Sequence, residues 1–101
     1  MSRFVLAPQA IADLAEIWRY IRDRSSEETA DRVEQTIRRK FIAVANAPGT
    51  GHRRRDLTGA PVLFFPVYSY LIVYRAEAKP IQIVAILHGN RDLKVVLRKR
   101  I

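Results

Sequence analysis

The sequence predicts an α+β fold in which a hairpin of two helices covers one face of a small, mainly antiparallel sheet. Apolar residues recur at steps of three and four positions between residues 8 and 46, as they do on one face of a helix. From residue 62 onward, short runs of β-branched and aromatic residues replace that period, which is typical of strands. Because helical and extended regions are segregated along the chain, the expected order is β-α-α-β-β-β, followed by a short basic C-terminal segment.

A first strand is expected over Arg3–Leu6, where a short apolar run ends before Pro8. A helix over Pro8–Asp23 follows, since proline is favourable at the first helical position, where its missing N–H would be unpaired anyway. The expected apolar face of this helix consists of Ile11, Leu14, Ile17, Trp18 and Ile21. Trp18 is therefore expected in the core, and Tyr20, which falls off this face, on the surface.

A second helix is expected over Ser26–Asn46. Ser25 and Glu28 fit a capping box, in which each side chain satisfies a backbone donor of the new helix. The apolar stripe of this helix consists of Ala30, Val33, Ile37, Phe41 and Val44. Because the connection between the two helices is very short, they should form an antiparallel hairpin.

Three strands are expected after the helices, over Val62–Val67, Tyr70–Ala76 and Ile81–His88. The last is almost continuously apolar, which predicts a strand covered on both faces. Residues 91–101 fit either a short helix or a frayed basic tail.

A turn at residues 77–80 predicts how the last two strands pair. Continuing from Ala76 opposite Ile81, the register places Leu71, Val73 and Arg75 on the same face as Gln82, Val84, Ile86 and His88. This face is expected to be open or covered by a partner. The other, more apolar face is expected against the helices and carries Ile72, Tyr74, Ile81, Ile83, Ala85 and Leu87. A slip of one residue would reverse the assignment.

Composition narrows the class of protein. The 101 residues fit one domain over residues 1–101, and a hydrophobic content of 49% is too high for a disordered basic tail. The absence of cysteine excludes a disulfide scaffold and a cysteine nucleophile, and it fits a cytoplasmic protein. No apolar run approaches the length of about 18 residues that spans a membrane. We therefore expect a soluble domain with no membrane partner.

The net charge of +8 is concentrated in the second half of the chain. Residues 1–46 hold eight bases and seven acids, whereas residues 47–101 hold ten bases and three acids, a net of +7. Net charge bears on partners rather than on fold. The C-terminal bases Lys94 and 98–100 could contact nucleic acid or an acidic protein, or could simply be solvated.

Few residues suggest chemistry. His88 ends a strand and could serve as a general acid or base, although a strand-end histidine bonded to backbone is the simpler interpretation. Arg53, Arg54 and Arg55 could hold phosphates or an acidic partner, or form a solvated run. His52 and His88 are the only histidines and neither has a carboxylate cluster beside it. No metal, cofactor or small-molecule substrate is therefore expected.

A series of short motifs runs through most of the chain. The motifs are Leu6-Ala7-Pro8-Gln9-Ala10, Asp13-Leu14-Ala15-Glu16-Ile17-Trp18 with Tyr20-Ile21, Ala30, Pro48-Gly49 with Gly51 and Arg53, Phe65-Pro66-Val67, Tyr70-Leu71-Ile72-Val73-Tyr74-Arg75, and Ile86-Leu87-His88-Gly89-Asn90-Arg91-Asp92. The last, His-Gly-x-Arg-Asp after a buried strand, is the most specific. In order and spacing, the series resembles the RelE/ParE superfamily of bacterial toxins, and the ParE-like branch most closely.

The resemblance implies the toxin of a type II toxin–antitoxin system, neutralised by an antitoxin whose acidic C-terminal segment wraps it. ParE-like toxins poison DNA gyrase without hydrolytic chemistry, whereas RelE-like toxins are ribosome-dependent endoribonucleases. Nuclease members carry a basic residue just before the third strand's apolar run, where this chain has Tyr70, expected opposite Leu87 and beside His88. Losing a cation that would stabilise developing phosphate charge favours the gyrase poison over the nuclease. A degenerate relative that only binds antitoxin is the third possibility.

Candidate site residues follow from the resemblance and the expected register. The target-binding candidates are His88, Arg91, Arg53, Arg54 and Arg55. If the protein is a nuclease, His88 is the acid or base, and Arg91, Arg53 or Arg55 clamp the phosphate. The antitoxin is expected to cover the strand face with Leu71, Val73, Arg75, Val84 and Ile86, or the outer groove of the helical hairpin.

Overall fold

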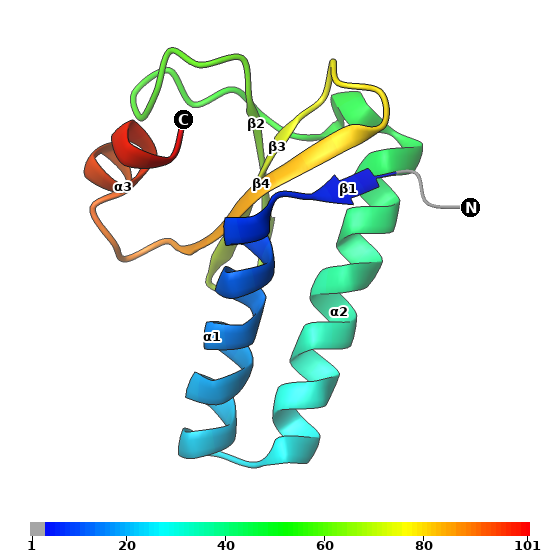
Figure 1. Cartoon of the computed structure of the whole chain (residues 1–101), viewed down its shortest axis with the longest axis vertical. Helices are drawn as coiled ribbons and strands as arrows, with labels where there is room; N and C mark the ends of the chain where they lie inside the picture. The colour runs from blue at the N-terminus through cyan, green and yellow to red at the C-terminus, as the bar shows by residue number, and fades with distance from the viewer. Residues whose placement is uncertain (1–3) are drawn as a thin grey trace.

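The computed structural model describes residues 4–101 and confirms the α+β class and the predicted order of elements (Figure 1). Two long helices form the antiparallel hairpin, and a third, shorter helix follows the last strand. The elements are β1 (Phe4–Leu6), α1 (Pro8–Arg24), α2 (Glu27–Asn46), the 3-10 turn η1 (Pro48–Thr50), β2 (Leu63–Val67), β3 (Tyr70–Arg75), β4 (Ile81–His88) and α3 (Leu93–Arg100). The basic C-terminal segment is thus a helix, not a frayed tail.

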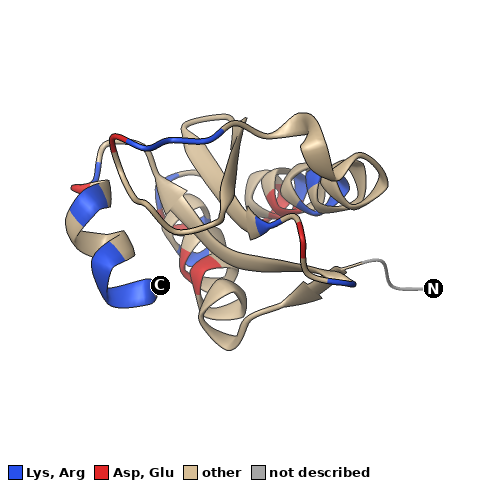
Figure 2. Ribbon diagram, turned by 90° about the horizontal axis from the view of Figure 1, so that it is seen from above, with Lys and Arg blue, Asp and Glu red and all other residues tan. Residues whose placement is uncertain are grey.

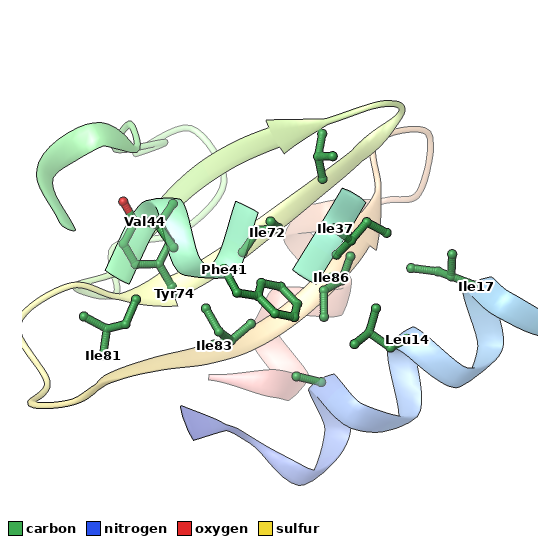
Figure 3. Packing of buried hydrophobic residues seen from close by; sticks show 12 residues of the cluster. Leu14, Ile17, Ile37, Phe41, Val44, Ile72, Tyr74, Ile81, Ile83 and Ile86 are labelled. Atoms are coloured by element: carbon green, nitrogen blue, oxygen red, sulfur yellow. The ribbon is translucent and has the colours of Figure 1, made fainter. Parts of the chain in front are cut away.

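The four strands form one mixed sheet in the order β1-β4-β3-β2. β1 pairs with β4 in parallel, and the other two pairings are antiparallel. The helical hairpin covers one face of this sheet, as predicted. In Figure 3, Phe41 and Ile37 of α2 point toward the sheet isoleucines. Phe41 is fully buried, and burying a phenylalanine side chain stabilises a fold by about 2–3 kcal/mol.

The first helix presents a slightly different face to the core from the predicted one. Ala10, Leu14 and Ile17 are buried, but Ile11 is 55% exposed and Trp18 is only half-buried. The small Ala10 faces the core near the start of α1, which follows directly on β1 and packs on β4. The placement of Ile11 and Trp18 in the core was therefore wrong, whereas Tyr20 is exposed as predicted.

The second helix has its predicted stripe but a different cap. Ser26, not Ser25, precedes the first turn, and its Oγ accepts a hydrogen bond from the Thr29 backbone N–H at 3.1 Å. Ser25 instead closes α1, since its N–H donates to Ile21 O. The proposed box of Ser25 with Glu28 was one residue too early, because two adjacent serines offer the same capping chemistry.

The predicted register of the β3–β4 hairpin holds only near the turn. Arg75 pairs with Gln82, but a bulge between Val73 and Tyr74 shifts every later pair, so that Val73 pairs with Ala85. Two consecutive residues of β4, Val84 and Ala85, therefore face the side away from the helical hairpin. Beyond the bulge the predicted faces of β4 are exchanged, whereas Leu71 and Ile72 of β3 keep theirs. Ile86 and not Leu87 faces the helical hairpin, and Tyr70 pairs with His88, not with Leu87.

The second face of the sheet is covered by the chain itself, contrary to the expectation that it is open or covered by a partner. Leu93 and Leu97 of α3 pack there with Val73, Val84 and Leu87, and residues Leu57, Ala60 and Val62 of the loop before β2 complete this cluster. Figure 1 shows α3 beside the sheet and away from α2. As predicted, β4 is covered on both faces.

The loop between α2 and β2 is fixed by a buried tyrosine of β3. The Tyr74 hydroxyl donates to Pro48 O at 2.7 Å and accepts from the Gly51 N–H at 2.9 Å. A Cβ on residue 51 would lie 2.6 Å from that hydroxyl oxygen, so the close approach requires glycine. Burial raises the pKa of Tyr74, although the Gly51 hydrogen bond opposes the shift.

Candidate target-binding site

The site begins with a cross-strand pair at one end of the sheet. Tyr70 opens β3 and His88 ends β4, directly opposite. Their rings meet edge to face, with centroids 5.3 Å apart and planes at 86°. This geometry is favourable for aromatic pairs and orients the imidazole.

The backbone after His88 fixes the hydrogen-bonding role of its ring. The Asn90 backbone N–H donates to His88 Nδ1 at 3.0 Å. A backbone N–H can only donate, so Nδ1 of the neutral ring is the acceptor and Nε2 carries the proton. The neutral His88 can thus offer a donor at Nε2, but its one basic lone pair is already engaged. This is the backbone-bonded strand-end histidine of the simpler interpretation.

A surface hollow of about 390 Å³ opens beside this pair. It is lined by Asp13, Glu16, Ile17, Tyr20, Tyr70, Ile86, His88 and Arg91. Ile17 and Ile86 are buried, while Tyr20 and Arg91 are exposed. Burial raises the pKa of Tyr70, and the neighbouring Tyr20 adds to the shift. The hollow therefore combines an apolar floor with two tyrosines, one imidazole and one guanidinium.

Four of the lining residues come from α1 and were not among the sequence-derived candidates. Asp13, Glu16, Ile17 and Tyr20 follow one another at helical spacing, so they lie on one face of α1. The sequence shows this spacing. It does not show that this face of α1 lies against the end of β4, because that position depends on tertiary packing.

An exposed tyrosine with unusual backbone geometry lies at the same end of the sheet. Tyr68, in the turn between β2 and β3, has a φ of 53° and is 61% exposed. A bulky residue in this left-handed region is an outlier that costs on the order of 1 kcal/mol. The Gly89 N–H donates to Ser69 O at 2.8 Å and ties this turn to the segment that follows His88.

The arginine loop does not join this site. None of Arg53, Arg54 and Arg55 lines the hollow beside His88. Arg54 makes a bidentate pair with Asp56, at 3.0 and 2.9 Å, while Arg53 and Arg55 are exposed. The hydrogen bond raises the pKa of Arg54 and lowers that of Asp56. Of the sequence-derived target-binding candidates, the structure brings together His88 and Arg91 only.

The antitoxin-binding candidates do not form one open surface. Val73 and Val84 are buried under α3 and the loop before β2, and Ile86 is buried on the opposite face by the helical hairpin. Leu71 and Arg75 keep partial exposure. The bulge in β4 and the folding of α3 onto the sheet account for this difference.

Neither a metal-site cluster nor a membrane-spanning helix is found in the described part of the chain. In residues 4–101, no cluster of His, Cys, Asp or Glu has the arrangement of a metal site. Over the same residues, no helix is long and apolar enough to cross a membrane.

Comparisons with known proteins agree with the fold. Among solved structures, a protein described as a chromosomal ParDE toxin–antitoxin system from P. aeruginosa matches with a TM-score of 0.72 at 22% sequence identity, over 86% of this chain and 98% of that chain. At this identity the likeness shows the fold. A search of curated proteins found no match. The model of the family described as the ParE toxin of the type II toxin–antitoxin system parDE matches residues 4–93. This match covers nearly the whole chain, which therefore belongs to the ParE toxin family of type II toxin–antitoxin systems.

Proposed function

We propose that this ParE-family toxin arrests growth in the cytoplasm by binding DNA gyrase, without cleaving nucleic acid itself. Family membership supports a toxin, and the geometry around His88 supports binding over hydrolysis. The observation that carries the proposal is the hydrogen bond from the Asn90 N–H to His88 Nδ1. It occupies the lone pair that a general base needs to take a proton.

The charges around the hollow also support binding. Phosphoryl transfer is accelerated by several fixed cations around the reacting phosphate. Among residues 4–101, Arg91 is the only lysine or arginine that lines this hollow, and Asp13 and Glu16 line it as well. Exposed Tyr20 and half-buried Tyr70 suit a protein partner, because tyrosine and arginine dominate the centres of protein interfaces.

We place the antitoxin on the outer groove of the helical hairpin. A hollow of about 400 Å³ there is lined by Ala15, Trp18, Arg19, Arg22 and Glu34. The Trp18 indole donates to Asp31 Oδ1 at 2.7 Å across the hairpin, and Arg22 lies 5.3 Å above its ring. Arginines beside a half-buried aromatic ring suit a segment that is acidic and partly apolar. Trp18 is the only tryptophan, so its fluorescence should change when the antitoxin's C-terminal segment binds.

A second candidate function is ribosome-dependent mRNA cleavage. His88 and Arg91 line the same hollow, which is the one arrangement that favours it. In that case His88 is the general acid and Arg91 the phosphate clamp. His88→Ala would then abolish codon-positioned cleavage on ribosomes, and full toxicity of this variant would argue against the nuclease.

Conditional expression distinguishes these functions in cells. A gyrase poison should induce the DNA-damage response and leave mRNA intact, with growth arrest that is relieved by the cognate antitoxin. Fragmented mRNA without DNA damage would favour the ribonuclease. Antitoxin binding without any growth arrest would identify a relative that has lost toxicity.

A further inference from the structure

A group of exposed bases lies on the opposite side of the sheet from the helical hairpin. Arg53 and Arg55 come from the loop before β2, and Lys94 and Arg98 come from α3. We call these four residues the α3–loop surface. Within residues 4–101, no ion pair engages any of them.

The loop and α3 lie side by side although they are far apart in the sequence. Leu57 and Thr58 of the loop line one hollow together with Lys94 and Arg98. In Figure 2, the blue stretch of the loop and the blue turns of the C-terminal helix lie at the same end of the molecule. The buried Leu97 holds α3 in this position against the sheet.

The acids nearest to this surface are already occupied. Asp56 is held by the bidentate pair with Arg54. Asp92 caps α3 by accepting a hydrogen bond from the Val95 N–H. Arg54 and, more weakly, Lys94 lower the pKa of Asp56, so this carboxylate offsets part of the charge. The four exposed bases still outnumber the two acids, and the surface keeps an excess of positive charge.

The helical hairpin has more basic side chains than this surface, but acids match them in number. Residues 8–46 contain seven bases and seven acids, so their net charge is zero. Some of these bases are paired, such as Arg38 with Glu34 at 2.9 Å. Positive charge without matching acids is thus a property of the sheet half and of the α3–loop surface in particular.

The geometry of this surface suits a nucleic-acid backbone. Lys94 and Arg98 are one helical turn apart, about 6 Å along the axis. Arg53 and Arg55 come from the neighbouring loop, which turns after Arg54, where the Leu57 and Thr58 N–H groups donate to Arg54 O. Phosphates of one DNA strand recur every 3.4 Å or so along the duplex axis. Basic side chains about 6 Å apart are therefore spaced to meet alternate phosphates.

The α3–loop surface carries no Phe, Tyr or Trp side chain that could stack on nucleobases or anchor a protein partner. The exposed tyrosines of residues 4–101 are Tyr20, which lines the hollow beside His88, and Tyr68, in the turn between β2 and β3. Among the large apolar side chains of the loop and α3 in the described structure, only Val95 is exposed. Proteins that bind single-stranded nucleic acid rely on aromatic stacking, and protein interfaces rely on aromatic anchors. Binding to the backbone of a duplex needs only cationic side chains.

We propose that the α3–loop surface binds the phosphate backbone of duplex DNA without sequence preference. This goes beyond gyrase inhibition, because it is a property of the isolated chain. In a ternary complex, the toxin would contact the DNA that its target holds, using a different side from the Tyr70–His88 hollow.

The test measures binding of the purified chain to a fluorescent duplex of about 20 base pairs over a series of salt concentrations. Four phosphate contacts predict a slope of log K against log salt of about −3 to −4, or a loss of roughly 100-fold between 50 and 200 mM salt. A quadruple variant should reduce the slope to near zero. It carries Arg53→Gln, Arg55→Gln, Lys94→Gln and Arg98→Gln.

A matched control removes the same charge from the helical hairpin. It carries Arg19→Gln, Arg24→Gln, Arg32→Gln and Arg39→Gln, all at exposed positions. This control should keep the native slope, because the charges that it removes lie away from the α3–loop surface. Equal loss in both variants would overturn the proposal by showing that net charge alone governs binding.

Three results with the native chain would also overturn it: no detectable duplex binding at 50 mM salt or so, tighter binding to single-stranded RNA of equal length, or tighter binding to polyglutamate. These measurements contain no gyrase. Their failure would therefore leave the proposed function intact, and failed gyrase inhibition would leave DNA binding intact.

Discussion

Arg100, at the end of α3, forms a nearly buried ion pair with Asp13 of α1. The Nη2–Oδ2 distance is 2.8 Å, and the two side chains are 13% and 12% exposed. Arg100 Nη2 also donates to Val84 O at 3.2 Å, and Asp13 Oδ2 accepts from the Ile86 N–H at 2.9 Å. β1 pairs with β4 only as far as Ile83, so these side chains satisfy the free edge of β4 at its bulge. One ion pair thus joins the first helix, the bulge and the last helix.

Breaking this pair should be costly. Asp13→Ala leaves the Arg100 guanidinium without its partner and the Ile86 N–H unpaired, for an expected loss of about 2–3 kcal/mol in the free energy of unfolding. Urea unfolding measures this loss of stability. The double variant with Arg100→Met should lose less than the sum of the single variants. As a control, Glu34→Ala breaks an exposed pair and should cost about 0.5 kcal/mol or less. Equal costs would contradict the role of the buried pair.

The Tyr74 hydroxyl should stabilise the loop before β2. Tyr74→Phe keeps the buried ring but leaves Pro48 O and the Gly51 N–H without this partner. We expect a loss of about 1–2 kcal/mol, measured by thermal unfolding. Tyr70→Phe is the comparison, because no hydrogen bond of its hydroxyl is seen in the described structure. If the two substitutions had the same effect, the hydroxyl contacts would not be what holds the loop.

The role of Ser26 as the cap of α2 can be tested selectively, because a second serine, Ser25, lies next to it. Ser26→Ala removes the acceptor for the Thr29 N–H and should cost about 1 kcal/mol. Ser25→Ala, one position earlier, should change stability by no more than a few tenths of that. Chemical unfolding of both variants suffices, and the opposite ranking would place the cap at Ser25.

Tyr68 should be less favourable for stability than an asparagine would be. Asparagine tolerates a φ of about 53° better than tyrosine does, so Tyr68→Asn should raise the free energy of unfolding by roughly 0.5–1 kcal/mol. Strained residues that persist often serve function, so the same change should weaken target inhibition. Tyr20→Asn, on regular helix, should not stabilise the protein. A destabilised Tyr68→Asn variant would show that the ring contributes more than the strain costs.

The sequence predicted the parts of this fold that depend on local periodicity. The stripe from Ala30 to Val44 and the strand over Ile81–His88 follow directly from a helical period and an apolar run. It did not predict the bulge beyond Val73, because that irregularity is stabilised by Asp13 and Arg100, which are 87 positions apart. A hairpin turn alone fixes register only up to the first such interruption.

The candidate site was predicted in part for a similar reason. The His-Gly-x-Arg-Asp motif identified His88 and Arg91, which do line one hollow. The contribution of α1 was missed, since helical spacing shows which residues share a face but not what that face meets. The arginines of the loop were grouped with His88 as target-binding candidates, whereas the loop lies against α3, because Leu57 packs on the cluster that contains the buried Leu97.

Gyrase supercoiling with purified components tests the central claim most directly. The toxin should inhibit supercoiling and accumulate gyrase-cleaved DNA, while mRNA on ribosomes stays intact. His88→Ala should weaken inhibition about tenfold or less, as loss of one interface side chain does, without changing the products. Unimpaired supercoiling at toxin excess, or codon-positioned mRNA cleavage that His88→Ala abolishes, would contradict the account.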